Sequence, residues 1–192
     1  HRAFYDARPD VRAVCHAHPV TATGFAVAGI PLDRCTLPEV VISLGAVPLA
    51  KYGVPGTDEL TEDIMQNYVN DYDAFLLANH GIVTIGHSLM SAYYKMETTE
   101  HFAKISLVAR QLGNENVFSP ERAQELVDAR ARYGVKAGAG CRIENSGATY
   151  APEVPMTGTA AISKNGEADI SADEVAELVR KVTAKVLEKL GK

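Results

Sequence analysis

Two histidines separated by one residue, His16 and His18, constrain this chain more than any other feature, because they end an apolar run that reads as a β-strand. Residues i and i+2 of a strand point to the same face, so the two imidazoles are expected side by side. A pair of this kind supplies half of a metal site.

A third histidine follows another apolar run, residues 74–78, and stands in the sequence Asn79-His80-Gly81. The glycine lets the backbone turn and approach closely, so His80 can join the pair from a neighbouring strand. Three neutral imidazole nitrogens suit Zn²⁺, and a fourth position left open is typical of a catalytic site. The alternative for each histidine is a hydrogen-bonded structural role at a strand end. His1, His87 and His101 lie in polar or helical surroundings and are interpreted as surface or packing residues.

Composition narrows the class of protein. With 192 residues, 46% apolar residues and 22% charged residues, the chain can bury one sizeable core and a small appendage. The net charge of −5 and the lack of a basic stripe with interleaved aromatic residues argue against nucleic-acid binding. Since the sequence has no apolar run of 18 residues, we expect no membrane span.

The three cysteines, Cys15, Cys35 and Cys141, are odd in number and form no C-x-x-C motif. This usage favours reduced thiols in a cytoplasmic protein. Cys15 directly precedes His16, so its side chain faces the opposite side of the strand and is expected in the core.

Periodicity and turn signals predict an alternation of helices and strands. The chain begins within what reads as an amphipathic helix, without an initiator methionine or a signal peptide, so we expect the natural protein to begin upstream. The remaining expected elements are strands at residues 11–18, 46–50, 74–78 and 82–85; helices at 20–28 (stopped by Gly29), from a cap at Thr57 or Asp58 to 68, at 88–112 and at 119–133; and a helix or short strand at 37–44.

The last third of the chain differs in composition. Residues 136–170 are rich in small residues and proline, which is typical of a flexible linker. Ser171 and Glu174 then form a capping box, and apolar residues follow at spacings of three and four, so residues 171–192 are expected to form an amphipathic helix. The sequence thus divides into a domain at 1–135, a linker and a terminal helix.

The order of several motifs resembles the class II aldolase and adducin head family, in particular its L-fuculose-1-phosphate aldolase branch. The motifs are His16-Ala17-His18-Pro19, the segments 44–53 and 55–57, Leu76 to Gly81, and Arg132-Tyr133-Gly134, and the resemblance extends over about residues 1–135. The resemblance implies an α/β fold, a three-layer α/β/α domain with a largely antiparallel central sheet, assembled as a homotetramer with active sites between subunits.

On this resemblance His16, His18 and His80 match the zinc ligands of the family, and zinc acts there as a Lewis acid. The catalytic glutamate and the phosphate-binding segment of the family are expected before His1. Tyr133 matches a tyrosine that reaches the site of a neighbouring subunit and donates a proton, the alternative being simple packing at a helix end. Where some aldolases carry another tyrosine this chain has Leu37, and Glu39 could offer a carboxylate across the interface, the alternative being a plain surface glutamate.

The expected reaction is zinc-dependent cleavage of a ketose 1-phosphate, such as L-fuculose 1-phosphate, to dihydroxyacetone phosphate and L-lactaldehyde. The alternatives are an L-ribulose-5-phosphate 4-epimerase, another phosphosugar lyase or decarboxylase, or a non-catalytic adducin-like interaction domain. The helix at 171–192 resembles the encapsulation peptides that bind shell proteins of bacterial microcompartments, which would place a cytoplasmic enzyme in a microcompartment lumen. Its alternative is a packing or oligomerisation helix.

Overall fold

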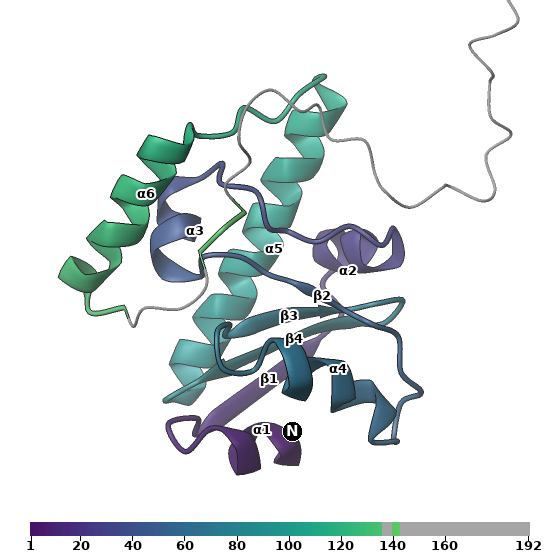
Figure 1. Ribbon diagram of the computed structural model, residues 1–192. Coiled ribbons are helices and arrows are strands. Elements are labelled where there is room, and N and C mark those ends of the chain that lie inside the picture. Colours follow the sequence, from purple (N-terminus) through teal and green to yellow (C-terminus); the bar gives the residue numbers. More distant parts are fainter. Residues whose placement is uncertain (136–139, 143–192) are drawn as a thin grey trace, which may run out of the picture. The chain divides into compact units, whose positions relative to one another are not determined.

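A computed structural model describes residues 1–135 and 140–142 (Figure 1). In chain order its elements are α1 (Arg2–Ala7), β1 (Ala13–Ala17), α2 (Val20–Val27), α3 (Pro38–Ser43), β2 (Leu49–Ala50), α4 (Glu59–Asn67), β3 (Ala74–Leu77), β4 (Gly81–Gly86), α5 (Leu89–Gln111), α6 (Pro120–Ala129) and the 3₁₀-helix η1 (Arg130–Tyr133).

The strands form one sheet in the order β1-β4-β3-β2. β4 pairs antiparallel with both β1 and β3, whereas β2 pairs parallel with β3. The two central strands, β3 and β4, are joined by the short turn that holds His80. The expectation of a largely antiparallel sheet is therefore confirmed.

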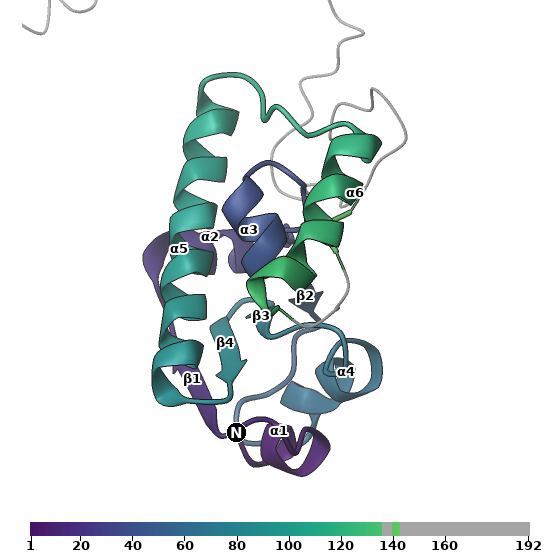
Figure 2. The same ribbon diagram turned by 90° about the vertical axis from the view of Figure 1, so that its left-hand side faces the viewer.

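Helices cover both faces of the sheet, which gives three layers (Figure 2). The long helix α5 and the short α2 lie on one face, where Phe25 and Phe102 are buried. On the opposite face α1 and α4 contribute Phe4 and Ile64 to a second apolar cluster. The α/β/α arrangement expected from the family resemblance is confirmed.

Strand β3 shows why the sheet needs a helical layer on each side. Ala74 and Leu76 pack with α2 and α5, while Phe75 and Leu77 pack with α1 and α4. All four side chains are buried. Because successive side chains of a strand point to opposite faces, the continuous apolar run contributes to the core on each face of the sheet, as expected for a strand that is buried on both faces.

The helix boundaries follow local signals. Ser88 accepts a hydrogen bond from the backbone of Ser91 at the start of α5, and Ser119 does the same for α6, which carries a proline in its first turn. Gly29 follows α2 with a φ of 72°, a left-handed conformation that favours glycine. The segment 37–44, left open between helix and strand, is helical in α3.

Two elements differ from the prediction by more than two residues at one boundary. The strand expected at 46–50 is only Leu49–Ala50, because Val47 instead forms an isolated bridge with Leu32. The helix expected to reach Tyr133 is α-helical only to Ala129 and continues as η1.

The expectation that all cysteines are reduced is wrong for two of them. Cys35 and Cys141 form a disulfide across a sequence separation of 106 residues. The backbone N–H of Arg142 donates to the Asp33 carbonyl at 2.7 Å, so the chain returns to lie beside the segment before α3. Cys15 remains a free thiol that packs against the core, as expected.

Residues 140–142 therefore lie against the domain, although they fall within the segment predicted as a linker. The rest of that segment and the predicted helix at 171–192 lie outside the described residues. Among the residues that the structure describes, no helix combines the length and the apolar character that crossing a membrane requires.

Candidate metal centre

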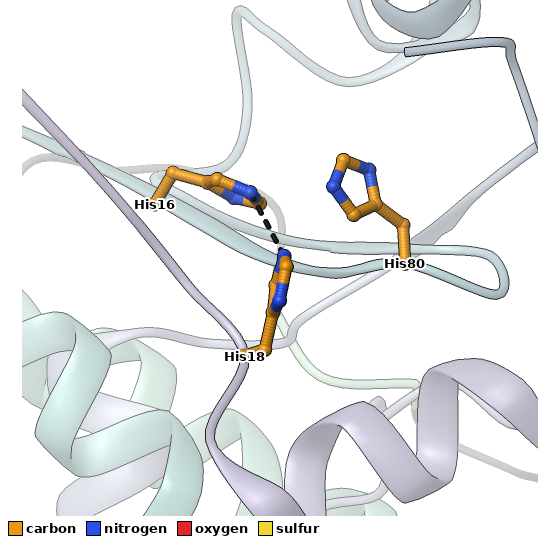
Figure 3. Close-up of side chains that lie close together, drawn as sticks. All are labelled: His16, His18 and His80. Atoms are coloured by element: carbon orange, nitrogen blue, oxygen red, sulfur yellow. Dashed lines mark hydrogen bonds between the residues drawn. The ribbon is translucent and has the colours of Figure 1, made fainter.

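The three histidines come from two places in the chain that the sheet brings together. His16 lies on β1, His18 follows the last residue of that strand, and His80 lies in the turn between β3 and β4. The pairing of His16 with Val83 and of Ala17 with Ile82 sets the end of β1 beside the beginning of β4. Figure 3 shows the three rings gathered at this corner of the sheet.

The distances suit a single ion. The ring centroids are 4.9 Å apart for His16 and His18, 4.8 Å for His16 and His80, and 5.0 Å for His18 and His80. The two Nε2 atoms of His16 and His18 are 3.1 Å apart, and one nitrogen from each of the three rings lies within 4.8 Å of the others. A tetrahedral ion with Zn–N distances of about 2.0–2.1 Å holds its nitrogens roughly 3.3–3.4 Å apart. Small side-chain movements would therefore complete the site.

The tautomer of His16 follows from its hydrogen bond. Its Nδ1 lies 2.8 Å from the carbonyl oxygen of Ile82, which can only accept, so Nδ1 carries the proton and donates. The lone pair is then on Nε2, which faces His18. A bond from the second ring nitrogen to a carbonyl is the usual way in which a protein fixes a metal-binding imidazole.

The environment also favours the neutral rings that a metal requires. Burial lowers the pKa of His16, and the neighbouring His80 and His18 lower it further, against the opposing effect of the Ile82 carbonyl. Burial likewise lowers the pKa of His80, with a smaller contribution from His18. Since only the neutral imidazole coordinates, both shifts extend metal binding toward lower pH.

His80 carries a buried nitrogen, Nδ1, that has no hydrogen-bond partner among the described residues. A buried polar atom left unsatisfied costs about 1–3 kcal/mol. In Figure 3 the other ring nitrogen of His80, Nε2, points toward the His16 and His18 rings, so Nε2 of His80 and the unprotonated Nε2 of His16 fit a donor set for a borderline cation such as Zn²⁺.

Gly81 makes room for the site by having no side chain. A Cβ at this position would collide with the Cδ2 atom of His18 and lie 2.7 Å from the carbonyl oxygen of Ala17. Asn79, two residues earlier, has a φ of 56°, a left-handed conformation that asparagine tolerates better than most residues. The Asn-His-Gly sequence thus places His80 in the turn and lets His18 approach the β4 backbone.

One polar residue near the site was not predicted. The carboxylate of Glu100, on α5, accepts hydrogen bonds from the backbone N–H groups of Thr21 and Ala22, just after His18. The sequence held one signal for such a partner: α2 starts at a proline, Pro19, whose side chain cannot cap a helix. That signal indicates the need for an acceptor but not which residue supplies it.

The two residues predicted to act in catalysis lie outside the histidine cluster. Glu39 is exposed in the first turn of α3, and Tyr133 is 69% exposed at the end of η1. Within the described part of the chain, the ligand cluster contains only His16, His18 and His80. Because α3 packs against η1, Glu39 and Tyr133 lie on adjacent elements.

The other histidines, His1, His87 and His101, are exposed, in line with the surface role expected for them. His87 also lines a cavity of about 700 Å³ near the opposite end of β4, where Gly86 lies. The charged residues there neutralise one another: Arg8 and Lys95 both form ion pairs with Asp73. None of His16, His18 and His80 lines this cavity, so it is separate from the histidine cluster.

Comparison with known proteins shows similarity over the part of the chain that holds the histidine cluster. Residues 1–107, which include all three histidines, match the family described as "Class II Aldolase and Adducin N-terminal domain". A 3-oxo-tetronate 4-phosphate decarboxylase of Escherichia coli O6:H1 is 37% identical over 112 residues, covering 56% of this chain and 52% of the relative. An L-fuculose phosphate aldolase of Methanococcus vannielii is 38% identical over 106 residues, covering 55% of this chain and 56% of the relative.

A solved structure of an L-fuculose 1-phosphate aldolase has a TM-score of 0.60 and 30% identity, and the match covers 68% of this chain and 59% of that one. The chain thus spans about half the length of the curated relatives that it matches. Because the family match covers more than half of the 192 residues and contains the histidine cluster, the chain belongs to the class II aldolase and adducin family.

Proposed function

We propose that the chain is part of a metal-dependent lyase that breaks a carbon–carbon bond in a phosphorylated sugar or sugar acid, with Zn²⁺ bound by His16, His18 and His80. The observation that carries the proposal is the convergence of three imidazoles, one nitrogen of each lying within 4.8 Å of the others. Three protein ligands are typical of catalytic rather than structural zinc.

When bound, Zn²⁺ supplies a Lewis acid that polarises a substrate carbonyl and stabilises the negative charge that develops as the neighbouring bond breaks. The protein favours the ligands in the required form: the Ile82 carbonyl fixes the tautomer of His16, and desolvation lowers the pKa of His16 and of His80. Exposure of His18 at the surface leaves the cluster accessible to substrate.

Cleavage of L-fuculose 1-phosphate to dihydroxyacetone phosphate and L-lactaldehyde is the preferred reaction. Its support is the L-fuculose phosphate aldolase at 38% identity and the aldolase structure at a TM-score of 0.60. Decarboxylation is the second candidate, because a relative at 37% identity is a 3-oxo-tetronate 4-phosphate decarboxylase. Both reactions leave negative charge beside a carbonyl group, so one electrophilic centre serves either.

Proton transfer needs further groups. The family resemblance assigns it to a glutamate before His1, to Tyr133 and, across an interface, to Glu39. Both described residues are exposed and lie on adjacent elements. In a homotetramer, Tyr133 and Glu39 would transfer protons at the histidine cluster of a neighbouring subunit.

The remaining alternatives differ in what they require of the cluster. An L-ribulose-5-phosphate 4-epimerase would use the same metal, whereas a non-catalytic adducin-like domain needs no ligands. The protonated Nδ1 of His16 and the close approach allowed by Gly81 favour a metal enzyme.

The terminal segment 171–192 is proposed to bind a microcompartment shell protein, on the strength of its capping box and apolar stripe. If the segment serves only as an encapsulation signal, its removal will leave turnover unchanged, whereas a loss of turnover or of the tetramer would make it part of the enzyme.

The enzyme is otherwise proposed to be cytoplasmic. Disulfides persist mainly in oxidising compartments, so the redox state of Cys35 and Cys141 in freshly isolated protein tests this location. Free thiols would support a cytoplasmic location, and an intact disulfide would contradict it.

The deciding experiment measures turnover in a protein that includes the segment expected before His1. Release of dihydroxyacetone phosphate from L-fuculose 1-phosphate, and of CO₂ from 3-oxo-tetronate 4-phosphate, is followed with and without a chelator. The matched variants are His80→Ala and His101→Ala, since His101 is an exposed histidine of α5. We expect chelator-sensitive release of one product that His80→Ala abolishes and His101→Ala retains. Release that survives the chelator would contradict the proposal.

A further inference from the structure

We infer that Glu100 is a positioning residue for the metal ligand His18, acting through the first turn of α2. The inference rests on the proposed metal site but concerns a residue outside it. His18 lies just beyond the sheet, because the pairing of β1 with β4 ends at Ala17. Within the described residues, the hydrogen bond recorded for its ring is the one to His16.

The backbone after His18 enters a helix at once. Pro19 is the N-cap of α2, and it makes no side-chain capping bond. The N–H groups of the second and third helical residues, which an N-cap side chain would normally satisfy, therefore need an acceptor from elsewhere.

Glu100 supplies both acceptors from a position about 80 residues away in sequence. One carboxylate oxygen accepts from the Thr21 N–H at 3.0 Å, and the other accepts from the Ala22 N–H at 2.8 Å. The negative charge also complements the positive end of the α2 dipole. Two charge-assisted bonds from one planar group fix both the position and the direction of this turn.

Next to Glu100, one face of α5 is buried in the core. Phe102 and Ala103, which follow Glu100 on α5, are buried at 1% and 0% exposure. Their cluster includes Ala22 of α2 and Ile82 of β4. The start of α2 is thus held against the strand that carries Gly81, the residue whose backbone the His18 ring approaches.

His18 is therefore held from both sides: by β1 before it and by the α2 turn after it. If the turn loosens, the ring can leave the narrow space beside Gly81, since the ring itself is exposed. A role in stability alone would predict a lower melting temperature with an unchanged metal site, whereas a positioning role predicts a changed site in protein that is still folded.

The test compares Glu100→Gln with Glu97→Gln, because Glu97 is an exposed glutamate one turn earlier on α5. Glutamine keeps the size of the side chain but presents an N–H₂ group to one of the two backbone donors. Zinc affinity is measured by competition with a chelator, and site geometry by the visible spectrum of bound Co²⁺, both well below the melting temperature. We expect a loss of about 10- to 100-fold in affinity and an altered Co²⁺ spectrum for Glu100→Gln only.

A metal-free readout separates this inference from the proposed function. In the apoprotein, the nuclear Overhauser effect between the His18 ring and the Gly81 α-protons reports their contact. It should weaken in Glu100→Gln, persist in Glu97→Gln, and return when Pro19→Ser adds a local cap to Glu100→Gln. A wild-type chain that binds no zinc would refute the metal site, but the contact between the His18 ring and Gly81 would still test the positioning of His18 by Glu100. An unchanged contact in Glu100→Gln, or an unchanged affinity and spectrum where zinc binds, overturns the positioning role.

Discussion

Replacing Gly81 with alanine tests how closely the β4 backbone and the His18 ring fit together. The new Cβ would collide with His18 Cδ2 and lie 2.7 Å from the Ala17 carbonyl oxygen. Ordinary contacts between non-bonded heavy atoms are about 3.5–4.0 Å, so the ring or the strand must move by roughly 1 Å. Metal–ligand distances tolerate only about ±0.2 Å.

The expected result is a loss of zinc affinity of about 10- to 100-fold, or about 1.4–2.8 kcal/mol. Competition with a chelator measures it, and urea unfolding confirms that the variant is folded. Two glycine variants serve as controls. Gly24→Ala adds a Cβ with no atom within 4 Å and should leave affinity unchanged. Gly86→Ala crowds the far end of β4, 2.6 Å from the Ala92 nitrogen, and should reduce stability without weakening zinc binding. A Gly81→Ala protein that binds zinc as tightly as the wild type would refute the fit.

Three further predictions concern pH and stability. Burial lowers the pKa of His16 and His80 below the unfolded value of 6.5. The metal-free protein should therefore keep its full free energy of unfolding above pH 6.5 and lose part of it below that pH, because the unfolded state takes up protons first. Urea unfolding between pH 5 and 8 measures this, and a free energy of unfolding that does not change with pH would refute the shifts. Reducing the bond between Cys35 and Cys141, which are 106 residues apart, should lower the free energy of unfolding by up to about 4–5 kcal/mol, measured with and without a phosphine reductant; equal stabilities would contradict this pairing. Glu115→Gln should cost about 3 kcal/mol in thermal or urea unfolding, because this buried carboxylate pairs with two arginine side chains at 3.0 and 3.1 Å, and a cost below 1 kcal/mol would show the pairs to be dispensable.

Local patterns predicted the central elements of the fold well. The apolar run at 74–78 and the long helix after Ser88 carry period and cap signals that tertiary contacts reinforce, and both appear as β3 and α5. β2 was predicted too long, because Val47 pairs with Leu32 outside the sheet, and this pairing depends on tertiary structure rather than on local propensity.

The histidine cluster was predictable because its parts are short motifs. The i, i+2 spacing places His16 and His18 on one side of β1, and the turn at Asn79-His80-Gly81 supplies the third ring. The hydrogen bonds of Glu100 to α2 and the pairing of Cys35 with Cys141 join residues far apart in sequence, and no local motif identifies which residues are the partners.

The stoichiometry of zinc bound to the 192-residue chain tests the central claim most directly. After removal of weakly bound metal, elemental analysis and calorimetric titration should give one zinc ion per chain for the wild type and for His101→Ala, a variant of an exposed histidine. The same measurements should give none for His80→Ala, with the fold retained because this residue lies in a turn at the end of the sheet. Equal zinc content in His80→Ala and wild type would contradict the three-histidine site.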